Sequence, residues 1–380
     1  MQQLSGESHK DAVNVYADAG VARARSLGNR GPLRYDSNGA VSAEILHAYN
    51  HYGFYVFENL IDSAEIDVLR LEFAELIDRA PVDNGADLDI QGRPAFGREF
   101  ARNPYTMIRP LSDPWGGTTL LGGRHPTKMS QPKAAQTAPK KVVFVISGMC
   151  QLSEAALRLY GHADILSIAE NINGTDFVPY NDATFVKQPG LGGAVSWHQD
   201  GVTHWDSPAW DDGIHGFNVQ VQLYECTAQN CLWVLPGTHT QGRIDIPKLV
   251  REQGEYLEDA VPLLCQPGDI TIVNRQVLHG SFANTSDQQR ISITFGFHRY
   301  ASILGAKGAL SQTNDETYSH QRIDERSAVI QVAIDARAQF YPEQPVYRYT
   351  PFVGREDELR HSAENIERVI KNYNLKDLSI

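Results

Sequence analysis

Three residues that can bind a metal stand in two short motifs of this 380-residue chain. His198 and Asp200 are separated by one residue in Ser196–Gly201, and His279 lies in Leu278–Ser281. Alternate side chains of an extended strand leave from the same face, so His198 and Asp200 are expected to converge on one point. With His279 they would form the two-histidine, one-carboxylate set that suits Fe(II) in oxygenases. A His-x-Asp pair alone is more often an ordinary surface pair, so downstream residues must support this interpretation.

A cationic residue that can bind a carboxylate follows the second histidine. Arg290 comes eleven residues after His279, within the stretch Gln289–Phe295. A guanidinium group there can hold a carboxylate through two parallel hydrogen bonds. Ser292 shares a strand face with Arg290 and is expected to assist it.

The order and spacing of these motifs resemble the phytanoyl-CoA dioxygenase family of Fe(II)- and 2-oxoglutarate-dependent oxygenases. The resemblance extends from about residue 40 to residue 300. The motifs that carry it are Lys187–Gly190, Trp197–Asp200, Leu232–His239, Pro267–Asp269, His279–Ser281 and Arg290.

The resemblance implies a role for each matching residue. His198, Asp200 and His279 would bind iron, and Arg290 would bind the distal carboxylate of 2-oxoglutarate. Ser281 is similar to a serine that contacts this cosubstrate, and O2 would be the second cosubstrate. Related halogenases have a small residue in place of the carboxylate ligand, so the presence of Asp200 disfavours halogenation.

Two further features of the matching region are a departure from the family motif near Asn230 and the lysine Lys187. The family usually has Asn-Gly-Cys-Leu where this chain has Gln229–Leu232. Asparagine is the residue best able to replace glycine at positive φ, so Asn230 is expected to keep the turn. Lys187 ends a predicted strand; it is expected either to pair with a carboxylate of the cosubstrate or substrate, or to extend into water.

Composition restricts the classes of partner. The chain has 34 Lys and Arg against 46 Asp and Glu, which gives a net charge of −12. This charge argues against nucleic acid and anionic membranes, makes a CoA thioester less natural, and favours a small or medium-sized metabolite. The four cysteines form no Cys-x-x-Cys pair, and we find neither a signal peptide nor a membrane span. A cytoplasmic protein is therefore expected.

Many short strands separated by Gly/Pro turns predict a mainly β fold with flanking helices around a double-stranded β-helix, a cupin-like jelly roll. We expect one oxygenase domain over residues 1–380. A short amphipathic helix over 363–373 would suit a homodimer contact. The predicted parts are an N-terminal arm (1–40), a helical scaffold (41–175) with a loop-rich lid (80–135), a jelly-roll core with the metal site (180–300), and a C-terminal extension (301–380).

The loop-rich lid is predicted to cover the mouth of the active site, because long irregular segments in compact domains are often functional. The alternative is a disordered insert. Arg109, Trp115 and Arg124 of this lid are candidates for contacting the substrate. His204 and Trp205, which follow the metal motif, are expected to form a wall of the substrate pocket.

The stretch Phe217–Leu223 alternates apolar and amide side chains, which predicts a strand with two unlike faces. By the resemblance, Val219 is expected to face the cavity, with the amides on the other face. The alternative is that the amides face the cavity and bind substrate.

The predicted reaction is hydroxylation of an unactivated C–H group with release of succinate and CO2. The same centre could also desaturate, epoxidise or close a ring. A cupin-like metal enzyme that does not use 2-oxoglutarate, or an inactive binding protein, would be the alternatives of another class. Arg290 argues against the first, and the complete set of ligands argues against the second.

Overall fold

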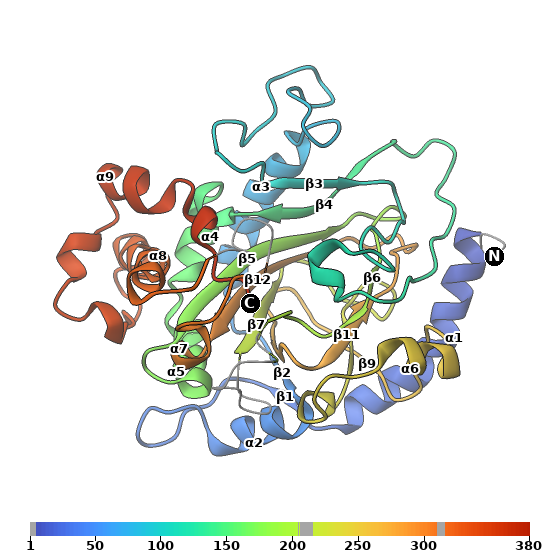
Figure 1. Cartoon of the computed structure of the whole chain (residues 1–380), viewed down its shortest axis with the longest axis horizontal. Helices are drawn as coiled ribbons and strands as arrows, with labels where there is room; N and C mark the ends of the chain where they lie inside the picture. The colour runs from blue at the N-terminus through green and yellow to red at the C-terminus, as the bar shows by residue number, and fades with distance from the viewer. Residues whose placement is uncertain (1–4, 204, 206–215, 310–315) are drawn as a thin grey trace.

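The computed structural model describes residues 5–203, 205, 216–309 and 316–380 (Figure 1). Within these ranges no helix combines the length and apolar character that crossing a membrane requires.

Two β-sheets form the centre of the molecule. The larger has the strand order β1-β2-β10-β7-β12-β5-β4-β3, and the smaller has the order β6-β11-β8-β9. Neighbouring strands are antiparallel except for β1 and β2, and the two sheets form the predicted jelly roll. The strands are β1 (Arg30–Gly31), β2 (Phe54–Phe57), β3 (Tyr105–Ile108), β4 (Val142–Ser147), β5 (Val178–Lys187), β6 (Val195–His198), β7 (Gly216–Gln222), β8 (Trp233–Leu235), β9 (Val261–Pro262), β10 (Ile270–Asn274), β11 (Leu278–Ser281) and β12 (Arg290–His298).

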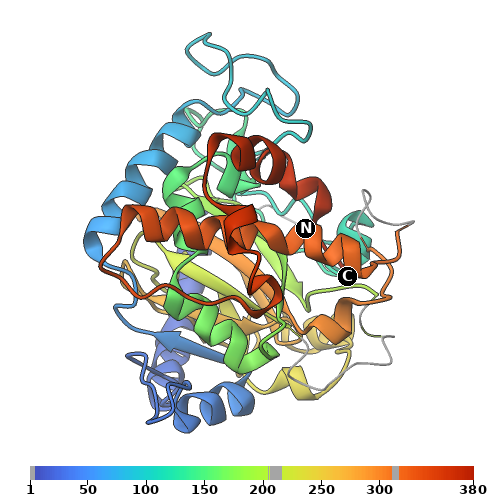
Figure 2. The same ribbon diagram turned by 90° about the vertical axis from the view of Figure 1, so that its left-hand side faces the viewer.

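Helices cover the outer face of the larger sheet. Figure 2 shows α4, α5 and α8 in front of its strands, and α8 packs on α4. The helices are α1 (Gly6–Ser26), α2 (Ala43–Tyr52), α3 (Ser63–Asp78), α4 (Glu154–Tyr160), α5 (Ala163–Asn173), α6 (Ile246–Gln253), α7 (Tyr300–Ile303), α8 (His320–Phe340) and α9 (Ala363–Asn365).

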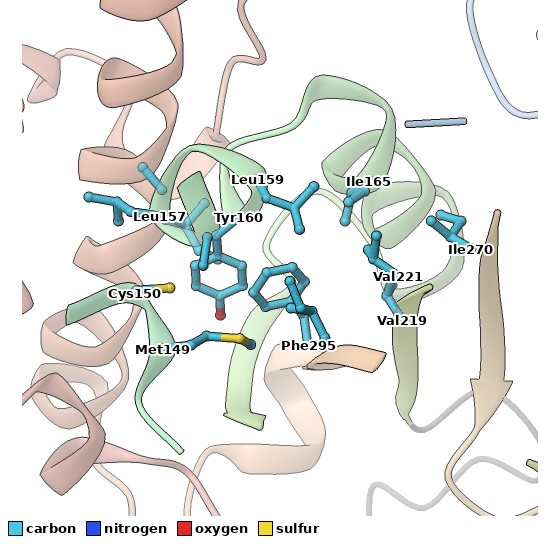
Figure 3. Close-up of a cluster of buried hydrophobic side chains, with 14 of the residues drawn as sticks. Met149, Cys150, Leu157, Leu159, Tyr160, Ile165, Val219, Val221, Ile270 and Phe295 are labelled. Carbon is cyan, nitrogen blue, oxygen red and sulfur yellow. The ribbon is translucent and has the colours of Figure 1, made fainter. Parts of the chain in front are cut away.

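The main hydrophobic core lies between these helices and the larger sheet. Figure 3 shows Tyr160 beside Phe295, and their ring centroids are 4.4 Å apart. Val219 and Val221 of β7 point into the same cluster, and both are fully buried. The apolar face of β7 therefore packs against the helices, which leaves its amide face for the interior of the jelly roll.

Local sequence signals explain several boundaries. Asp62 caps α3 by accepting a hydrogen bond from the backbone N–H of Ala64, and α2 ends at Gly53 in the left-handed conformation (φ 81°). The helical scaffold differs from the prediction at Val142–Ser147, which forms strand β4. This run is rich in β-branched residues and is buried on both faces, which suits a strand covered on both sides.

The predicted N-terminal arm is a helix packed on the smaller sheet. The ring of Tyr16 in α1 stacks on Trp233 of β8 at 4.4 Å. Gly20 lies so close to Trp233 that a Cβ atom there would be 2.6 Å from the indole ring. This close approach requires the absence of a side chain, so Gly20 sets the position of the helix.

Candidate active site

The three candidate metal ligands converge at one end of the smaller sheet. Strands β6 and β11 are antiparallel, and their register places His279 directly opposite His198. Asp200 follows β6 and turns back toward both rings: its Oδ1 is 3.5 Å from His198 Nε2, and its Oδ2 is 3.9 Å from His279 Nε2. All three residues are buried, and their ligand atoms lie within 4.8 Å of one another. This donor set could hold a divalent metal ion.

Backbone carbonyls orient both imidazoles. His198 Nδ1 lies 2.9 Å from the carbonyl of Ser196, and His279 Nδ1 lies 2.8 Å from the carbonyl of Val277. A carbonyl only accepts, so each Nδ1 carries the proton and each Nε2 keeps its lone pair toward the site. Burial, followed by the neighbouring His198, lowers the pKa of His279 to about 4. His279 is therefore neutral near pH 7, as a metal ligand must be.

Asp200 is held in its ionised form by its surroundings. Burial alone would raise the pKa of this carboxyl, but Arg124 and the two histidines lower it well below its usual range. Arg124 Nη1 is 3.3 Å from Asp200 Oδ1, and Asn218 Nδ2 donates a hydrogen bond of 2.7 Å to Oδ2. The site thus offers two imidazole nitrogens and one carboxylate, a donor set that suits Fe(II).

Arg290 lies in the same cavity and has only neutral partners. Its Nε donates to Ser292 Oγ at 2.8 Å, Nη1 to the carbonyl of Asn230 at 3.3 Å, and Nη2 to Gln220 Oε1 at 3.3 Å. Ser281 also lines this cavity. No carboxylate in the described ranges pairs with the Arg290 guanidinium group, so its charge is available to an anionic ligand.

Ser292 and Asn230 support Arg290 from behind. Ser292 does not line the cavity; it accepts from Arg290 and donates to Gln222 Oε1 at 2.5 Å. Asn230 does not adopt the positive φ expected of it. Its side chain instead holds the turn, because Oδ1 accepts from the backbone N–H of Thr227 at 3.0 Å. That leaves the Asn230 carbonyl free to accept from Arg290.

Lys187 fits neither alternative of the sequence analysis. It lies opposite Arg290 in the register of β5 and β12, and it is 1% exposed. Its Nζ donates a 2.5 Å hydrogen bond to the carbonyl of Phe282, and it does not line the cavity. Lys187 is thus shielded from water, and no carboxylate in the described ranges forms an ion pair with it.

The prediction that Val219 faces the cavity is wrong, as is the placement of the amides away from it. Asn218 and Gln220 line the cavity, whereas Val219 is packed under the helices (Figure 3). Alternation in β7 indicated two unlike faces, but it could not tell which face the helices cover. The alternative that places the amides in the cavity agrees with the structure, and alternation was the signal for it.

The lid contributes part of the cavity wall. Trp115 and Arg124 line the cavity, and the Trp115 ring contacts Phe185 of β5 edge to face, with the ring centroids 6.4 Å apart. Arg109 does not: it is exposed, and its Nη2 donates to Gln131 Oε1 at 3.0 Å, so its predicted substrate contact is not supported. Trp205 lines a neighbouring groove, and His204 lies outside the described residues.

Two buried residues beside the triad were missed by the sequence analysis. The ring of His125 lies 4.0 Å from the ring of His198, and burial lowers the pKa of His125. Arg275 lies with its Nε 4.0 Å from Asp200 Oδ2 and its guanidinium group over the ring of Tyr180. Both residues stand outside the motifs, so only the folded chain reveals their position.

A jelly roll that places two histidines and a carboxylate in a buried cavity defines the class of non-haem metal oxygenases. Comparison with known proteins gives the family. The family model described as phytanoyl-CoA dioxygenase (PhyH) matches residues 49–292, and the chain belongs to this family. The predicted family is thus confirmed, and the matched region is a dioxygenase domain of the class that uses Fe(II) and 2-oxoglutarate.

The relatives match over different lengths. Phytanoyl-CoA dioxygenase 1 of Oryza sativa subsp. japonica is 29% identical over 119 residues, which cover 28% of this chain and 40% of that protein. The phytanoyl-CoA dioxygenase domain-containing protein 1 of Danio rerio is 32% identical over 122 residues, again 40% of its length. The Dictyostelium discoideum homolog of the latter is 24% identical and is covered to 95%, with 72% of this chain. The chain thus spans less than half of the first two relatives.

Solved structures show a more distant similarity. AviO1 from Streptomyces viridochromogenes Tue57 is 18% identical, with a TM-score of 0.48 over 68% of this chain and 95% of AviO1. EctD from S. alaskensis with 2-oxoglutarate and 5-hydroxyectoine is 18% identical, with a TM-score of 0.46 over 71% of this chain and 83% of EctD.

Proposed function

We propose that this protein is an Fe(II)- and 2-oxoglutarate-dependent dioxygenase that hydroxylates an unactivated C–H group of a small or medium-sized metabolite. The observation that carries the proposal is one cavity that holds both the buried triad of His198, Asp200 and His279 and the guanidinium group of Arg290. Desaturation, epoxidation and ring closure by the same centre remain alternatives. Cytoplasmic location, a homodimer and a single domain stay predictions.

The residues of the site divide the work between binding and orientation. His198, Asp200 and His279 would hold Fe(II) on one face, and Arg290 would bind the distal carboxylate of 2-oxoglutarate, with Ser281 beside it. When bound, the metal and 2-oxoglutarate supply the oxidising chemistry, which consumes O2 and releases succinate and CO2.

The cavity wall and the residues around Asp200 complete the site. Trp115 and Phe185 would exclude water and contact the substrate. Asn218 would fix the carboxylate of Asp200 through its 2.7 Å hydrogen bond to Oδ2.

A cupin-like metal enzyme without 2-oxoglutarate is the main alternative. Arg290 argues against it, because a buried cation with only neutral partners is costly unless an anion joins it. A distal carboxylate at this position would form charge-assisted hydrogen bonds and remove that cost.

The test is anaerobic addition of Fe(II), then 2-oxoglutarate, to metal-free protein while the visible charge-transfer band is recorded. We expect the band in the wild type and no band with Asp200→Ala. Arg290→Ala should raise the 2-oxoglutarate concentration for half-saturation about tenfold to a hundredfold, because a hydrogen bond to a charged group contributes about 1.5–3 kcal/mol. Ser292→Ala, which removes one supporting hydrogen bond, serves as a milder control and should have a smaller effect. Iron binding without a band would reject the 2-oxoglutarate assignment and favour the cupin-like alternative.

A further inference from the structure

A second hollow adjoins the metal cavity and shares one residue with it. We call it the arginine groove; it is lined by Arg124, Val202, Trp205 and Arg243, among others. Arg124 lines both the groove and the metal cavity. A ligand in the groove would therefore lie next to the three candidate metal ligands.

Arg243 is presented for binding at the outer side of the groove. Its guanidinium group lies 5.5 Å from the ring centroid of Trp205, and its Nη2 donates to the carbonyl of Val202 at 3.3 Å. It is exposed and has no ion-pair partner among the residues that the structure describes. An aromatic ring and a carbonyl thus hold this cation in place, and no group in the described ranges neutralises it.

Arg124 forms the inner side, and its charge is offset only by a proposed metal ligand. The side chain is 18% exposed, and its single ion-pair partner in the described part of the chain is Asp200, at 3.3 Å. Its other polar contact is a 3.5 Å approach of Nε to the His125 ring. Once Asp200 binds a metal ion, the carboxylate is shared between the metal and Arg124.

Among the residues that the structure describes, charge balance in the loaded site leaves Arg124 uncompensated. The two charges of Fe(II) balance the two carboxylates of 2-oxoglutarate, and Asp200 balances Arg290. Arg124 then remains beside a divalent cation, and Arg275, 4.0 Å from Asp200, adds a further positive charge. A low-dielectric site strongly disfavours such an excess of one sign, so a further anion would stabilise the loaded enzyme.

We propose, on the basis of the function proposed above, that the substrate carries an anionic group that binds in the arginine groove. A carboxylate, sulfate or phosphate group would be held by Arg124 and Arg243, and the carbon to be oxidised would extend into the cavity walled by Trp115 and Phe185. In a chain with a net charge of −12, a groove of two arginines also selects anions by local potential.

The test measures chemical labelling of Arg243 by phenylglyoxal in the Fe(II)- and 2-oxoglutarate-loaded protein. Sodium sulfate is the probe, with ionic strength held constant by chloride, and peptide mass spectrometry reads the labelled arginine. We expect sulfate to slow labelling of Arg243 at least threefold, and Arg124→Gln to abolish most of this protection. Arg348 is exposed and lines neither hollow, so its labelling and the Arg348→Gln variant are matched controls.

The inference is overturned if sulfate leaves labelling of Arg243 unchanged, or slows it no more than labelling of Arg348. The charge-transfer band is recorded in the same sample, which separates the two proposals. Absence of the band rejects the iron and 2-oxoglutarate function, whereas a band without sulfate protection rejects only the anionic substrate.

A second measurement uses succinate release stimulated by small-molecule extract that has been divided on an anion exchanger. Stimulation by the retained fraction supports the inference. Stimulation confined to the unretained fraction overturns it.

Discussion

Lys187 lies in an environment unlike that of most lysines, whose amino groups contact water. It is fully buried, and one backbone carbonyl accepts its hydrogen bond. Burial, followed by the charge of Arg290, lowers its pKa well below the usual value, while Cys231 and Asp113 raise it by less. In the folded state the neutral amine is therefore favoured over a wider pH range than in the unfolded state.

This difference predicts how stability depends on pH. Between the lowered pKa of folded Lys187 and its ordinary value of about 10.4, the unfolded chain binds more protons, so raising the pH stabilises the folded state. Relative to Lys187→Met, the wild type should gain unfolding free energy as pH rises toward 10, with a limiting slope of about 1.4 kcal/mol per pH unit. Urea unfolding from pH 7 to 10 measures this, and the exposed Lys140→Met is the control. If the difference in unfolding free energy between the wild type and Lys187→Met did not change with pH, the lowered pKa of Lys187 would be contradicted.

The sequence predicted the candidate site residues that belong to short local motifs. His198, Asp200 and His279 converge because β6 and β11 pair antiparallel in the smaller sheet, and Arg290, on β12 of the larger sheet, lines the same cavity. Predictions that depended on which side of a strand is covered by helices failed, and Val219 is the clearest case. Periodicity gives the difference between two faces, but only the packing of other elements decides which is inside.

At the scale of elements, a glycine holds the lid against the segment Gly201–Thr203 after Asp200, which we call the metal loop. Gly122 has φ 67°, and a Cβ atom there would lie 2.6 Å from Val202 Cγ2. Gly117 in the same lid has φ 68°, yet the nearest atom to its added Cβ would be 3.9 Å away. The two glycines therefore share a backbone conformation and differ in contact with the metal loop.

Alanine at these positions separates the two effects. Gly117→Ala should cost about 1–2 kcal/mol, the strain of a left-handed alanine. Gly122→Ala should cost more, because Val202 must move as well, and it should weaken sulfate protection of Arg243. Thermal unfolding and the labelling assay measure both effects. Equal losses of stability and equal protection would show that the lid does not rest on Val202.

Residues 378–380 connect the C-terminal extension to the site, which the sequence did not indicate. All three are buried, and Leu378 and Ile380 pack in one cluster with Val178 of β5 and Ile303 of α7. Leu378 N–H donates to the carbonyl of Tyr180, a cavity residue, and Val202 N–H donates to the carbonyl of Ile380 at 3.3 Å. The extension is thus part of the support of the cavity wall.

Deleting residues 378–380 should lower both stability and the affinity for 2-oxoglutarate, because the chain loses apolar burial and three backbone hydrogen bonds, the third from Ala309 N–H to the carbonyl of Ser379. Leu378→Ala keeps all three hydrogen bonds, so it should cost about 2–5 kcal/mol of stability and leave the charge-transfer titration near that of the wild type. Urea unfolding and the titration provide the two measurements. A deletion that binds 2-oxoglutarate as the wild type does would limit this segment to packing.

For the molecule as a whole, the larger sheet has an apolar face toward the helices and a polar face toward the interior of the jelly roll. The outer face of the larger sheet packs on α4, α5 and α8, and its inner face carries Asn218, Gln220, Ser292 and Arg290. The sequence predicted this architecture, since short strands with Gly/Pro turns are typical of a jelly roll. It missed β4, the route of the C-terminal extension, and β3, which lies inside the predicted loop-rich lid, because the local sequence of these segments does not indicate what they pair with.

A buried polar interior stabilises the fold only when its charges are compensated, which predicts how ligands change the stability of the entire chain. A metal that binds only the folded state should raise the unfolding free energy by about 2.7 kcal/mol at one hundred times its dissociation constant. Mn(II) serves as a redox-stable substitute for Fe(II) in a thermal unfolding assay. We expect 2-oxoglutarate to raise the melting temperature further only when Mn(II) is present, because its keto acid end needs the metal while its distal carboxylate needs Arg290. The Arg290→Ala variant should keep the increase caused by Mn(II) and lose the additional increase caused by 2-oxoglutarate. An equal increase from 2-oxoglutarate without metal, or in Arg290→Ala, would place the dicarboxylate outside the cavity that the two sheets enclose.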